Sequence, residues 1–316
     1  MQATKILIVG TGAIGGFYGA LLAKSGAEVS VVCRSDFNHV KQQGYLIQSN
    51  TLGEWSFMPA QVLQNASEYQ GQADYVILCT KIIPDINRVQ LIKAAVSEKT
   101  CIVFIQNGVE VEQEIIDAFP DNEVISGLAF ICSSKIKPGI IQHQAYGKLT
   151  LGSIHNPGNK TDSAGQLSHL INQAGIKSNT SDSIIKMRWL KCLWNAAFNP
   201  LSVLSDGLST QDILSSQEQL VRTIMQEVCI IAAACGYPLA SDSIDINIKN
   251  THAMPPYKTS MLLDFENYRP MEIEAILGNT VRAAQREKTA CPTLDTLYAL
   301  MKLKELSSAP INEELL

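Results

Sequence analysis

Three polar side chains recur along one otherwise apolar stretch of the chain, MRWLKCLWNAAFNP. They are Lys191, Asn195 and Asn199, and their four-residue spacing places them on one face of a helix. Polar groups on an apolar helix are costly unless they have partners, so this stripe predicts a face toward a hydrated cleft or a polar network. Partial desolvation would lower the pKa of Lys191 and help its ammonium group to act as an acid.

A hydroxyl and a carboxylate flank a second segment, SMLLDFENYRPMEIE. Ser260 opens this segment, and Glu272 stands directly before an apolar run that begins at Ile273, as a carboxylate at the start of a buried helix would. Taken singly, each of these residues also fits a helix cap or a solvated helix face. Beside a nucleotide site, they suggest a lysine–carboxylate pair that acts on a substrate next to a nicotinamide ring.

The start of the chain carries a pattern typical of nucleotide binding. A short β-branched run, Lys5–Val9, predicts a buried strand, and helix formers follow at Ala13–Lys24. The motif G-x-G-x-x-G joins them and consists of Gly10, Thr11, Gly12, Ala13, Ile14 and Gly15. Its glycines allow a tight turn and the close approach of a pyrophosphate to the helix N-terminus. The alternative is a glycine-rich turn that binds nothing.

The end of the second predicted strand, Glu28–Cys33, indicates which dinucleotide would bind. An NAD site carries an acidic residue there, whereas this chain has Arg34. Because a cation at this position suits the 2′-phosphate of NADP, we predict NADP(H) as the cofactor. The alternative is that Arg34 is solvated and that Asp36 accepts the ribose hydroxyls.

Two further apolar runs, Ala73–Thr80 and Thr100–Gln106, enclose a helical stretch at Ile82–Ser97. This alternation predicts a parallel sheet wound with helices, in which ligands bind at the carboxyl ends of the strands. Lys81 and Asn107 stand at those ends, so both are candidate site residues. The alternatives are a solvated lysine and a turn asparagine, since turn chemistry alone explains Asn-Gly.

The remaining pattern divides the chain near Ser181–Asp182. Residues 123–152 predict shorter antiparallel strands, with turns at Lys135–Gly139 and Ala145–Gly147. A helix is predicted at Ser163–Ala174 and a strand at Ile176–Thr180. Further helices are predicted at Ile184–Leu204, Ile213–Cys235, Ser241–Thr251, Met271–Glu287 and Leu294–Leu306. We therefore predict an α/β fold, with a Rossmann-type doubly wound sheet in residues 1–181 and an all-α domain in residues 182–316.

The composition excludes several other classes of protein. The 316 residues are 46% hydrophobic and 17% charged, which is typical of globular chains, and the net charge of −5 disfavours nucleic-acid and acidic-membrane partners. The apolar segment 6–23 resembles an export signal or membrane anchor, but its glycines argue against an export signal, and its flanks of one lysine each lack the charge bias of a membrane anchor. The eight cysteines form no CxxC pair and predict buried free thiols rather than a metal site. We expect a cytoplasmic protein.

The chain resembles the ketopantoate reductase (2-dehydropantoate 2-reductase) family over essentially its whole length. The motifs that carry the resemblance are ILIVGTGAIG at the start, CTK at Lys81, QNG at Asn107, WLKCLWNAAFNPLS at Lys191 and TSMLLD…MEIEAILG from Ser260 to Gly278. Many dehydrogenases share the first motif, but the K-x₃-N-x₃-N-P and S-M-L-x-D…E-I-x₄-G elements are much more specific. The resemblance implies a helical domain like that of 6-phosphogluconate dehydrogenase behind the Rossmann domain.

The family's activity implies that NADPH reduces the 2-oxo group of ketopantoate to give pantoate, a precursor in pantothenate biosynthesis. By resemblance, Lys191 would donate a proton to the carbonyl oxygen, and Glu272 would orient Lys191 and lie near the substrate hydroxyl and the nicotinamide ribose. The substrate-binding residues would be Lys191, Asn195, Asn199 and Ser260. The cofactor-binding residues would be the glycine motif, Arg34, Lys81, Asn107, Glu272 and, by a looser alignment, Ser133.

Two positions depart from the family pattern in the substrate pocket. Tyr257 stands where the family often has a substrate-binding asparagine, and Ser209 stands where some members have one. They leave open an alternative, in which the chain reduces another branched or aromatic 2-oxo acid. A third hypothesis is an NADP-binding module without catalysis, which a retained Lys191–Glu272 pair would disfavour. Family members occur as monomers and dimers, so a homodimer is one expected state.

Overall fold

The computed structural model describes residues 3–158, 162–254 and 258–308. Tyr257, one of the two departures from the family pattern, therefore lies outside the described residues. The internal contacts divide the chain into two compact units. The first unit comprises Met1–Lys81, Ile86–Gln106 and Glu112–Ile184, and the second comprises Ile82–Asp85, Asn107–Val111 and Ile185–Leu316. The division at Ile184 lies just after the expected boundary, and nothing in the sequence indicated the two short segments.

A single ten-stranded sheet forms the frame of the first unit among the described residues. Its strand order is β4-β3-β9-β8-β7-β6-β1-β2-β5, and β10 pairs with β9. The parallel strands are β1 (Lys5–Val9), β2 (Glu28–Val32), β5 (Val62–Leu63), β6 (Tyr75–Leu78) and β7 (Cys101–Ile105), which pairs with the start of β8 (Val124–Lys137). β1, β6 and β7 are almost wholly buried and strongly apolar, as strands covered on both faces must be.

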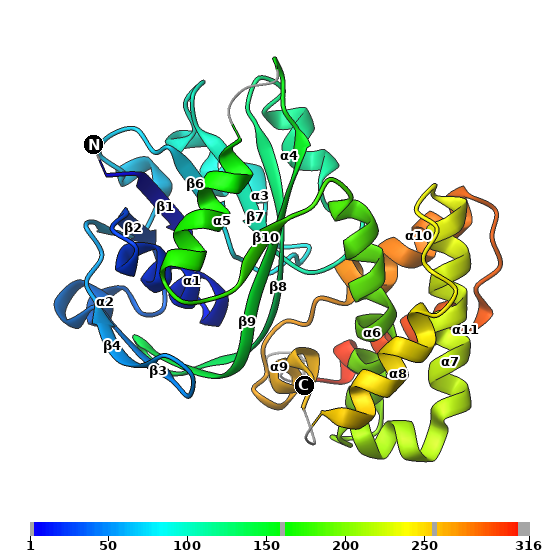
Figure 1. The fold of residues 1–316 in the computed structure, drawn as a ribbon. Coiled ribbons are helices and arrows are strands. Elements are labelled where there is room, and N and C mark those ends of the chain that lie inside the picture. The colour runs from blue at the N-terminus through cyan, green and yellow to red at the C-terminus, as the bar shows by residue number, and fades with distance from the viewer. Residues whose placement is uncertain (1–2, 159–161, 255–257, 309–316) are drawn as a thin grey trace, which may run out of the picture. The chain divides into compact units, whose positions relative to one another are not determined.

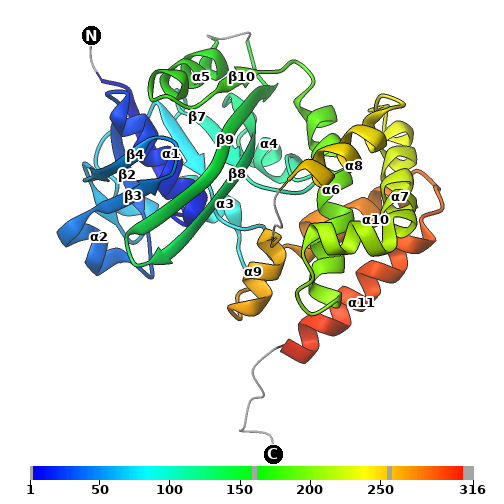
Figure 2. The same cartoon turned by 60° about the horizontal axis from the view of Figure 1, so that its bottom comes forward.

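Helices cover both faces of this sheet (Figure 1 and, in a turned view, Figure 2). The connections β1 to β2 and β6 to β7 run in opposite directions along the sheet, so right-handed crossovers put α1 (Ala13–Lys24) and α3 (Arg88–Ile92) on opposite faces. α5 (Ser163–Gln173) contacts α1, and α4 (Gln113–Ala118) contacts α3. α2 (Phe37–Gln43) follows β2. The predicted Rossmann-type sheet is confirmed.

Several predicted elements of the first unit differ in the structure. Residues 124–155 form two long antiparallel strands, β8 and β9 (Ile140–His155), rather than short segments. The residues predicted as a turn, Ala145–Gly147, lie inside β9, where register shifts accommodate the positive φ of Tyr146 and Gly147. The predicted helix Ile82–Ser97 is reduced to α3 and the 3₁₀ turn Lys93–Ala95, because Pro84 disfavours helix before it.

Three short strands and two pairings with β9 were not predicted. The strands are β3 (Tyr45–Ser49), β4 (Gly53–Phe57) and β5, and a 3₁₀ turn follows at Ala66–Glu68. β3 and β4 are rich in polar residues, and they are stabilised by pairing, with β3 joined in parallel to β9. β10 (Ser178–Thr180) also runs parallel to β9, so this edge of the sheet depends on contacts between distant segments.

The second unit is helical within the described residues, as predicted for the C-terminal half. Its helices are α6 (Ile184–Leu204), α7 (Thr210–Ala234), α8 (Ser243–Ala253), α9 (Ser260–Glu266), α10 (Asn279–Arg286) and α11 (Pro292–Ser308). α9 was not predicted, and the predicted helix Met271–Glu287 is a π-helical turn, Glu274–Gly278, followed by α10. The apolar faces of these helices share one core that includes Trp189, Phe198 and Leu277. Within the described ranges, no helix has the length and apolarity needed to cross a bilayer.

Candidate active site

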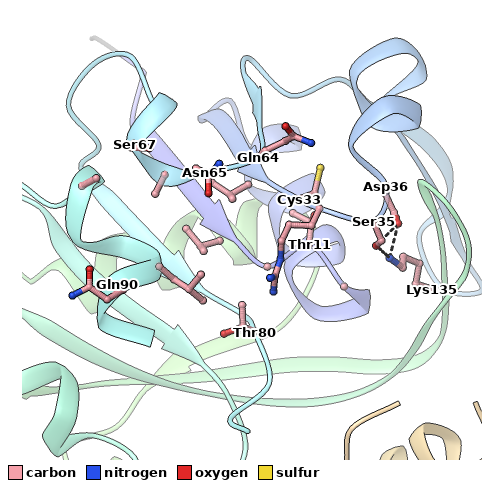
Figure 3. A pocket seen from close by; sticks show the side chains of 18 residues that line it. Thr11, Cys33, Ser35, Asp36, Gln64, Asn65, Ser67, Thr80, Gln90 and Lys135 are labelled. Atoms are coloured by element: carbon pink, nitrogen blue, oxygen red, sulfur yellow. Dashed lines mark hydrogen bonds and ion pairs between the residues drawn. The ribbon is translucent and has the colours of Figure 1, made fainter. Parts of the chain in front are cut away.

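A cavity of about 470 Å³ opens in the first unit at the carboxyl ends of β1, β2 and β6 (Figure 3). Of the predicted cofactor residues, Gly10, Thr11, Gly12 and Arg34 line it. The other residues predicted to bind the cofactor are not part of this lining: Ala13, Ile14, Gly15, Lys81, Asn107, Ser133 and Glu272. The cavity wall also includes residues that the sequence did not single out, among them Gln64, Asn65, Thr80 and Lys135.

The glycine motif has the local geometry that a pyrophosphate requires. Gly12 is the N-cap of α1, so the unpaired N–H groups of the first helical turn face the cavity edge. A Cβ added at Gly12 would meet no protein atom within 4 Å, whereas one at Gly15 would lie 2.2 Å from the Gly10 carbonyl oxygen. Gly15 thus permits the close packing of α1 on the turn, and Gly12 leaves room for a ligand.

Arg34 and Asp36, the two residues that could distinguish NADP from NAD, are in different environments. Arg34 is exposed at the cavity, whereas Asp36 is only 4% exposed. Asp36 Oδ1 accepts hydrogen bonds from Lys135 at 2.8 Å and Ser35 at 2.8 Å, and its Oδ2 accepts one from the Gly139 N–H at 3.2 Å. Burial acts to raise the pKa of Asp36, but these hydrogen bonds and the charge of Lys135 hold it below its usual range.

A chain of hydrogen bonds in the second unit joins three of the predicted residues. Lys191 Nζ donates to Asn107 Oδ1 at 2.8 Å, and Asn107 Nδ2 donates to Glu272 Oε2 at 3.0 Å. The other carboxylate oxygen, Glu272 Oε1, accepts from the Ile82 N–H at 3.2 Å. An ammonium group can only donate and a carboxylate can only accept, so the two ends fix the orientation of the Asn107 amide.

The segment Asn107–Val111 is held against the π-helical turn that follows Glu272. The Val109 N–H donates to the Ala275 carbonyl at 3.2 Å, and Asn279 Nδ2 donates to the Val109 carbonyl at 2.7 Å. Gly108 has φ +97, and a Cβ there would lie 2.4 Å from the Ala275 oxygen. This close approach therefore requires glycine and fixes Asn107 beside Glu272.

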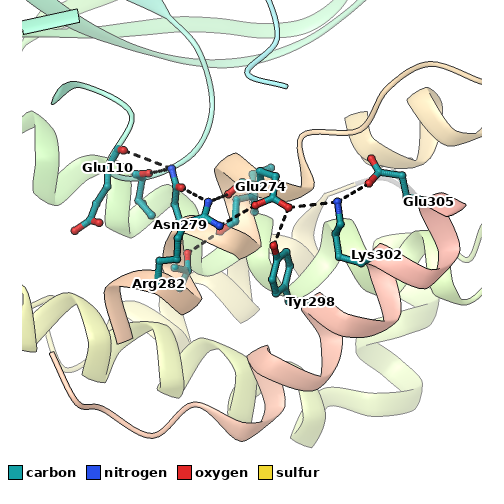
Figure 4. Close-up of polar contacts among 10 residues, drawn as sticks. Glu110, Glu274, Asn279, Arg282, Tyr298, Lys302 and Glu305 are labelled. Atoms are coloured by element: carbon teal, nitrogen blue, oxygen red, sulfur yellow. Dashed lines mark hydrogen bonds and ion pairs between the residues drawn. The ribbon is translucent and has the colours of Figure 1, made fainter. Parts of the chain in front are cut away.

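Asn279 belongs to a polar network around Glu274 (Figure 4). Arg282 donates to Glu274 at 2.8 Å and to Asn279 Oδ1 at 2.6 Å, and Tyr298 donates to Glu274 at 2.7 Å. Lys302 lies 3.4 Å from the same carboxylate. These contacts tie the π-helical turn to α10 and α11, so the backbone next to Glu272 is held from several sides.

Lys191 is partly buried, and two charged side chains, Arg188 and Glu272, influence its pKa. Burial and, to a smaller extent, the charge of Arg188 lower its pKa, Glu272 opposes both, and the net result is a pKa of about 8. Arg188 lies one turn earlier on α6, is 1% exposed and donates to the Gly108 carbonyl at 3.0 Å. A lysine poised near neutral pH can give up a proton more readily than an ordinary one.

The other predicted substrate residues have different surroundings. Asn195 and Asn199 follow Lys191 on α6 and are 7% and 1% exposed. Both side-chain polar atoms of Asn199 are buried without a hydrogen-bond partner in the structure, which is costly for an amide. Ser260 is exposed as the first residue of α9, and the neighbouring Thr259 caps that helix.

The remaining candidates belong to other elements of the chain. Ser209, a departure from the family pattern, is the N-cap of α7 and accepts from the Asp212 N–H. Ser133 lies in β8 with its Oγ buried and without a hydrogen-bond partner, and Lys81 follows β6. Among the described residues, no group of histidine, cysteine and carboxylate side chains could hold a metal ion.

Sequence reasoning missed Arg188, Lys135 and Asn279. Arg188 had a visible signal, since it is a charge within the apolar stretch that contains Lys191. Lys135 and Asn279 gave no such signal, because their partners Asp36 and Val109 are remote in the sequence.

Comparison with protein families identifies the chain. The family model described as ketopantoate reductase PanE/ApbA matches residues 6–156, and the model of its C-terminal part matches residues 183–305. The chain belongs to the ketopantoate reductase family. This confirms the resemblance drawn from the motifs, and ketopantoate reductases are oxidoreductases, so the predicted enzyme class is confirmed as well.

Individual relatives agree with this assignment to the ketopantoate reductase family. The crystal structure of 2-dehydropantoate 2-reductase from Methylococcus capsulatus is 53% identical, has a TM-score of 0.91 and covers 96% of this chain and 97% of that one. A 2-dehydropantoate 2-reductase from Nostoc sp. is 34% identical and covers 96% of this chain and 95% of its own. D-mandelate dehydrogenase, solved with NADH and anilino(oxo)acetate, is 25% identical with a TM-score of 0.87, covering 96% and 99%.

Proposed function

We propose that this chain catalyses the NADPH-dependent reduction of 2-dehydropantoate to pantoate in pantothenate biosynthesis. The observation that carries the proposal is the hydrogen-bond chain from Lys191 through Asn107 to Glu272. It presents a proton donor of lowered pKa that is oriented by a fixed amide and carboxylate. The two relatives of 34% and 53% identity that are named 2-dehydropantoate 2-reductase support the choice of substrate.

The proposed roles follow from the hydrogen-bonding capacity of each side chain. Lys191 donates a proton to the 2-oxo oxygen as negative charge develops on it, and Asn107 and Glu272 hold the amine in position. Asn195, Asn199 and Ser260 bind the carboxylate and hydroxyl of the substrate, a role for which the unpaired amide of Asn199 is suited. When bound, the nicotinamide supplies the hydride.

The cofactor residues are proposed on the same basis. The glycine motif, Gly10 to Gly15, would hold the pyrophosphate at the N-terminus of α1, and Arg34 would contact the 2′-phosphate. Lys81, Ser133, Asn107 and Glu272 would contact other parts of the dinucleotide. Residues 1–181 would thus bind NADP and residues 182–316 would carry the substrate and catalytic groups, with Asn107 added from the first half.

Oxidation of NADPH and of NADH with a panel of 2-oxo acids tests the proposed function. Ketopantoate should give the highest kcat/KM, ahead of 2-oxoisovalerate and phenylglyoxylate, and NADPH should be preferred. A preference for phenylglyoxylate would favour the aromatic alternative, which the likeness to D-mandelate dehydrogenase motivates. Nucleotide binding without oxidation in the presence of any 2-oxo acid would instead indicate an NADP-binding module and contradict the proposal.

Replacing Gly12 with alanine is expected to weaken NADPH binding by about tenfold while leaving the melting temperature nearly unchanged. The added methyl group meets no protein atom but occupies the space that the pyrophosphate would enter. Gly15→Ala is the matched comparison, because its methyl group would overlap the Gly10 carbonyl and should lower Tm. Titration of NADPH by fluorescence and thermal unfolding measure the two effects, and full NADPH affinity in Gly12→Ala would contradict this placement.

Ketopantoate reduction is expected to slow as the pH rises through about 8, because Lys191 must be protonated to donate. Arg188→Met removes a neighbouring charge that lowers the pKa of Lys191, so this alkaline limb should move to higher pH by about one unit. Arg188→Lys keeps the charge, and Lys186→Met removes an exposed charge on α6. Both controls should leave the limb in place in a profile of kcat against pH, and an unmoved limb in Arg188→Met would contradict the argument.

We propose that the reaction takes place in the cytoplasm, where a reducing environment suits the cysteines. All eight are free, and burial is the main cause that raises the pKa of several of them, including Cys101 and Cys192. The homodimer stays a prediction, which light scattering of the purified protein would test.

A further inference from the structure

Lys135 lies in the wall of the same cavity as Arg34, although Lys135 belongs to β8 and Arg34 follows β2, about a hundred residues earlier in the chain. It stands near the end of β8, and its ammonium group reaches Asp36 and Ser35 at the carboxyl end of β2 (Figure 3). Two of its three N–H donors are accounted for by Asp36 Oδ1 at 2.8 Å and Ser35 Oγ at 3.4 Å. The side chain is 26% exposed, so the group is accessible from the cavity.

The Lys135–Asp36 pair changes what this end of the cavity can recognise. In an NAD site a carboxylate near this point accepts the ribose hydroxyls. Here both oxygens of Asp36 already accept hydrogen bonds from the protein, and the side chain is almost completely buried. Asp36 therefore has little capacity left to bind a ribose, and Lys135 offsets the negative charge that would otherwise repel a phosphate.

The charge balance at the cavity suits a phosphate monoester. Such a group carries about −1.5 to −2 charges near neutral pH. Arg34 and Lys135 provide two positive charges, and Asp36 provides one negative charge that is directly paired with Lys135. A ribose without a 2′-phosphate offers these two cations no negative charge to bind.

We propose that Lys135 is a second cation of the 2′-phosphate site and, with Asp36, a determinant of the preference for NADP over NAD. This inference rests on the proposed use of NADP and names a further residue that selects the cofactor. Arg34 and Lys135, which are remote in sequence, both bind the phosphate. Asp36 already accepts hydrogen bonds from the protein, so NAD lacks the carboxylate that usually accepts its ribose hydroxyls.

Calorimetric titration of the full chain with adenosine 2′,5′-bisphosphate and with 5′-AMP tests this inference without any 2-oxo acid. The unaltered protein should bind the bisphosphate more tightly than 5′-AMP. Lys135→Met should weaken the bisphosphate by about tenfold and leave 5′-AMP unchanged, because one charge-assisted contact is lost. Lys135→Arg should keep the preference, and Lys137→Met, an exposed lysine of the same strand outside the cavity, should behave like the unaltered protein.

Three results would overturn the inference while leaving the proposed cofactor intact. The first is an unchanged preference for the bisphosphate in Lys135→Met, and the second is an equal loss of affinity for both ligands. Recovery of bisphosphate binding in the double variant Asp36→Asn/Lys135→Met would also overturn it, since Lys135 would then act only by masking Asp36. An absence of preference in the unaltered protein would refute the proposed use of NADP together with the inference.

Discussion

Replacing Lys191 with alanine is expected to lower kcat for ketopantoate reduction by about a hundredfold to ten-thousandfold. The alanine cannot protonate the developing alkoxide, and water in its place is a far weaker acid than an ammonium group of pKa about 8. The affinity for NADPH should stay close to that of the unaltered protein, because Lys191 is not part of the nucleotide cavity. Steady-state kinetics and fluorescence titration of NADPH measure the two quantities separately.

The control for this prediction lies on the same helix. Lys186 is an exposed lysine of α6, so Lys186→Ala removes an equal charge without touching Asn107. It should leave kcat unchanged. The alkaline fall in rate near pH 8 should also vanish from the residual activity of Lys191→Ala. Near-normal turnover in Lys191→Ala would show that another group donates the proton.

Glu272→Gln is expected to lower kcat by about ten- to hundredfold with only a small change in fold stability. Glu272 accepts from two donors, the Asn107 amide and the Ile82 N–H. A glutamine has one acceptor oxygen and one NH₂ group. Either the Asn107 NH₂ group or the Ile82 N–H must then face the NH₂ group of the glutamine, where no hydrogen bond can form. If the Asn107 amide rotates to resolve the conflict, it presents its NH₂ group to Lys191, and the amine loses its acceptor.

The control for Glu272→Gln is a second glutamate of the same unit, whose replacement removes the same charge without changing a hydrogen bond to Asn107. Glu305 pairs with Lys302 at 2.9 Å on α11, remote in sequence from the Asn107 segment, and Glu305→Gln should leave kcat unchanged. Steady-state kinetics and thermal unfolding of both variants, measured side by side, make the comparison. Equal activities in the two variants would contradict the orienting role of Glu272.

The helices and strands predicted with the correct bounds are those in which apolar residues recur strongly at helix or strand spacing. The strand Lys5–Val9, the helix Ala13–Lys24 and the helix Ile184–Leu204 have the predicted bounds. Elements that depend on distant partners were missed or misjudged, as β3 and the length of β9 illustrate. Their residues are not distinctive in themselves, because pairing across the sheet supplies the stabilisation.

The candidate site has the same limit. Residue types and spacing were sufficient to single out Lys191, Asn107 and Glu272, each in its own segment. Their direct contact depends on how three remote segments pack, as do the burial of Asp36 and its bond to Lys135. The sequence favoured Arg34 over Asp36 by residue type alone, and it could not reveal the environment of Asp36, which β8 and the Gly139 turn determine.

The short segments Ile82–Asp85 and Asn107–Val111 belong to the second unit although the first half of the gene encodes them. A chimera that joins the N-terminal half of this chain to the C-terminal half of a homologue would therefore take Asn107 from one parent and Lys191 and Glu272 from the other. A crossover anywhere between Asn107 and Lys191 separates Asn107 from its two partners, whereas a crossover before Asn107 exchanges all three residues together. A chimera with the first kind of junction therefore needs two parents that place these residues compatibly.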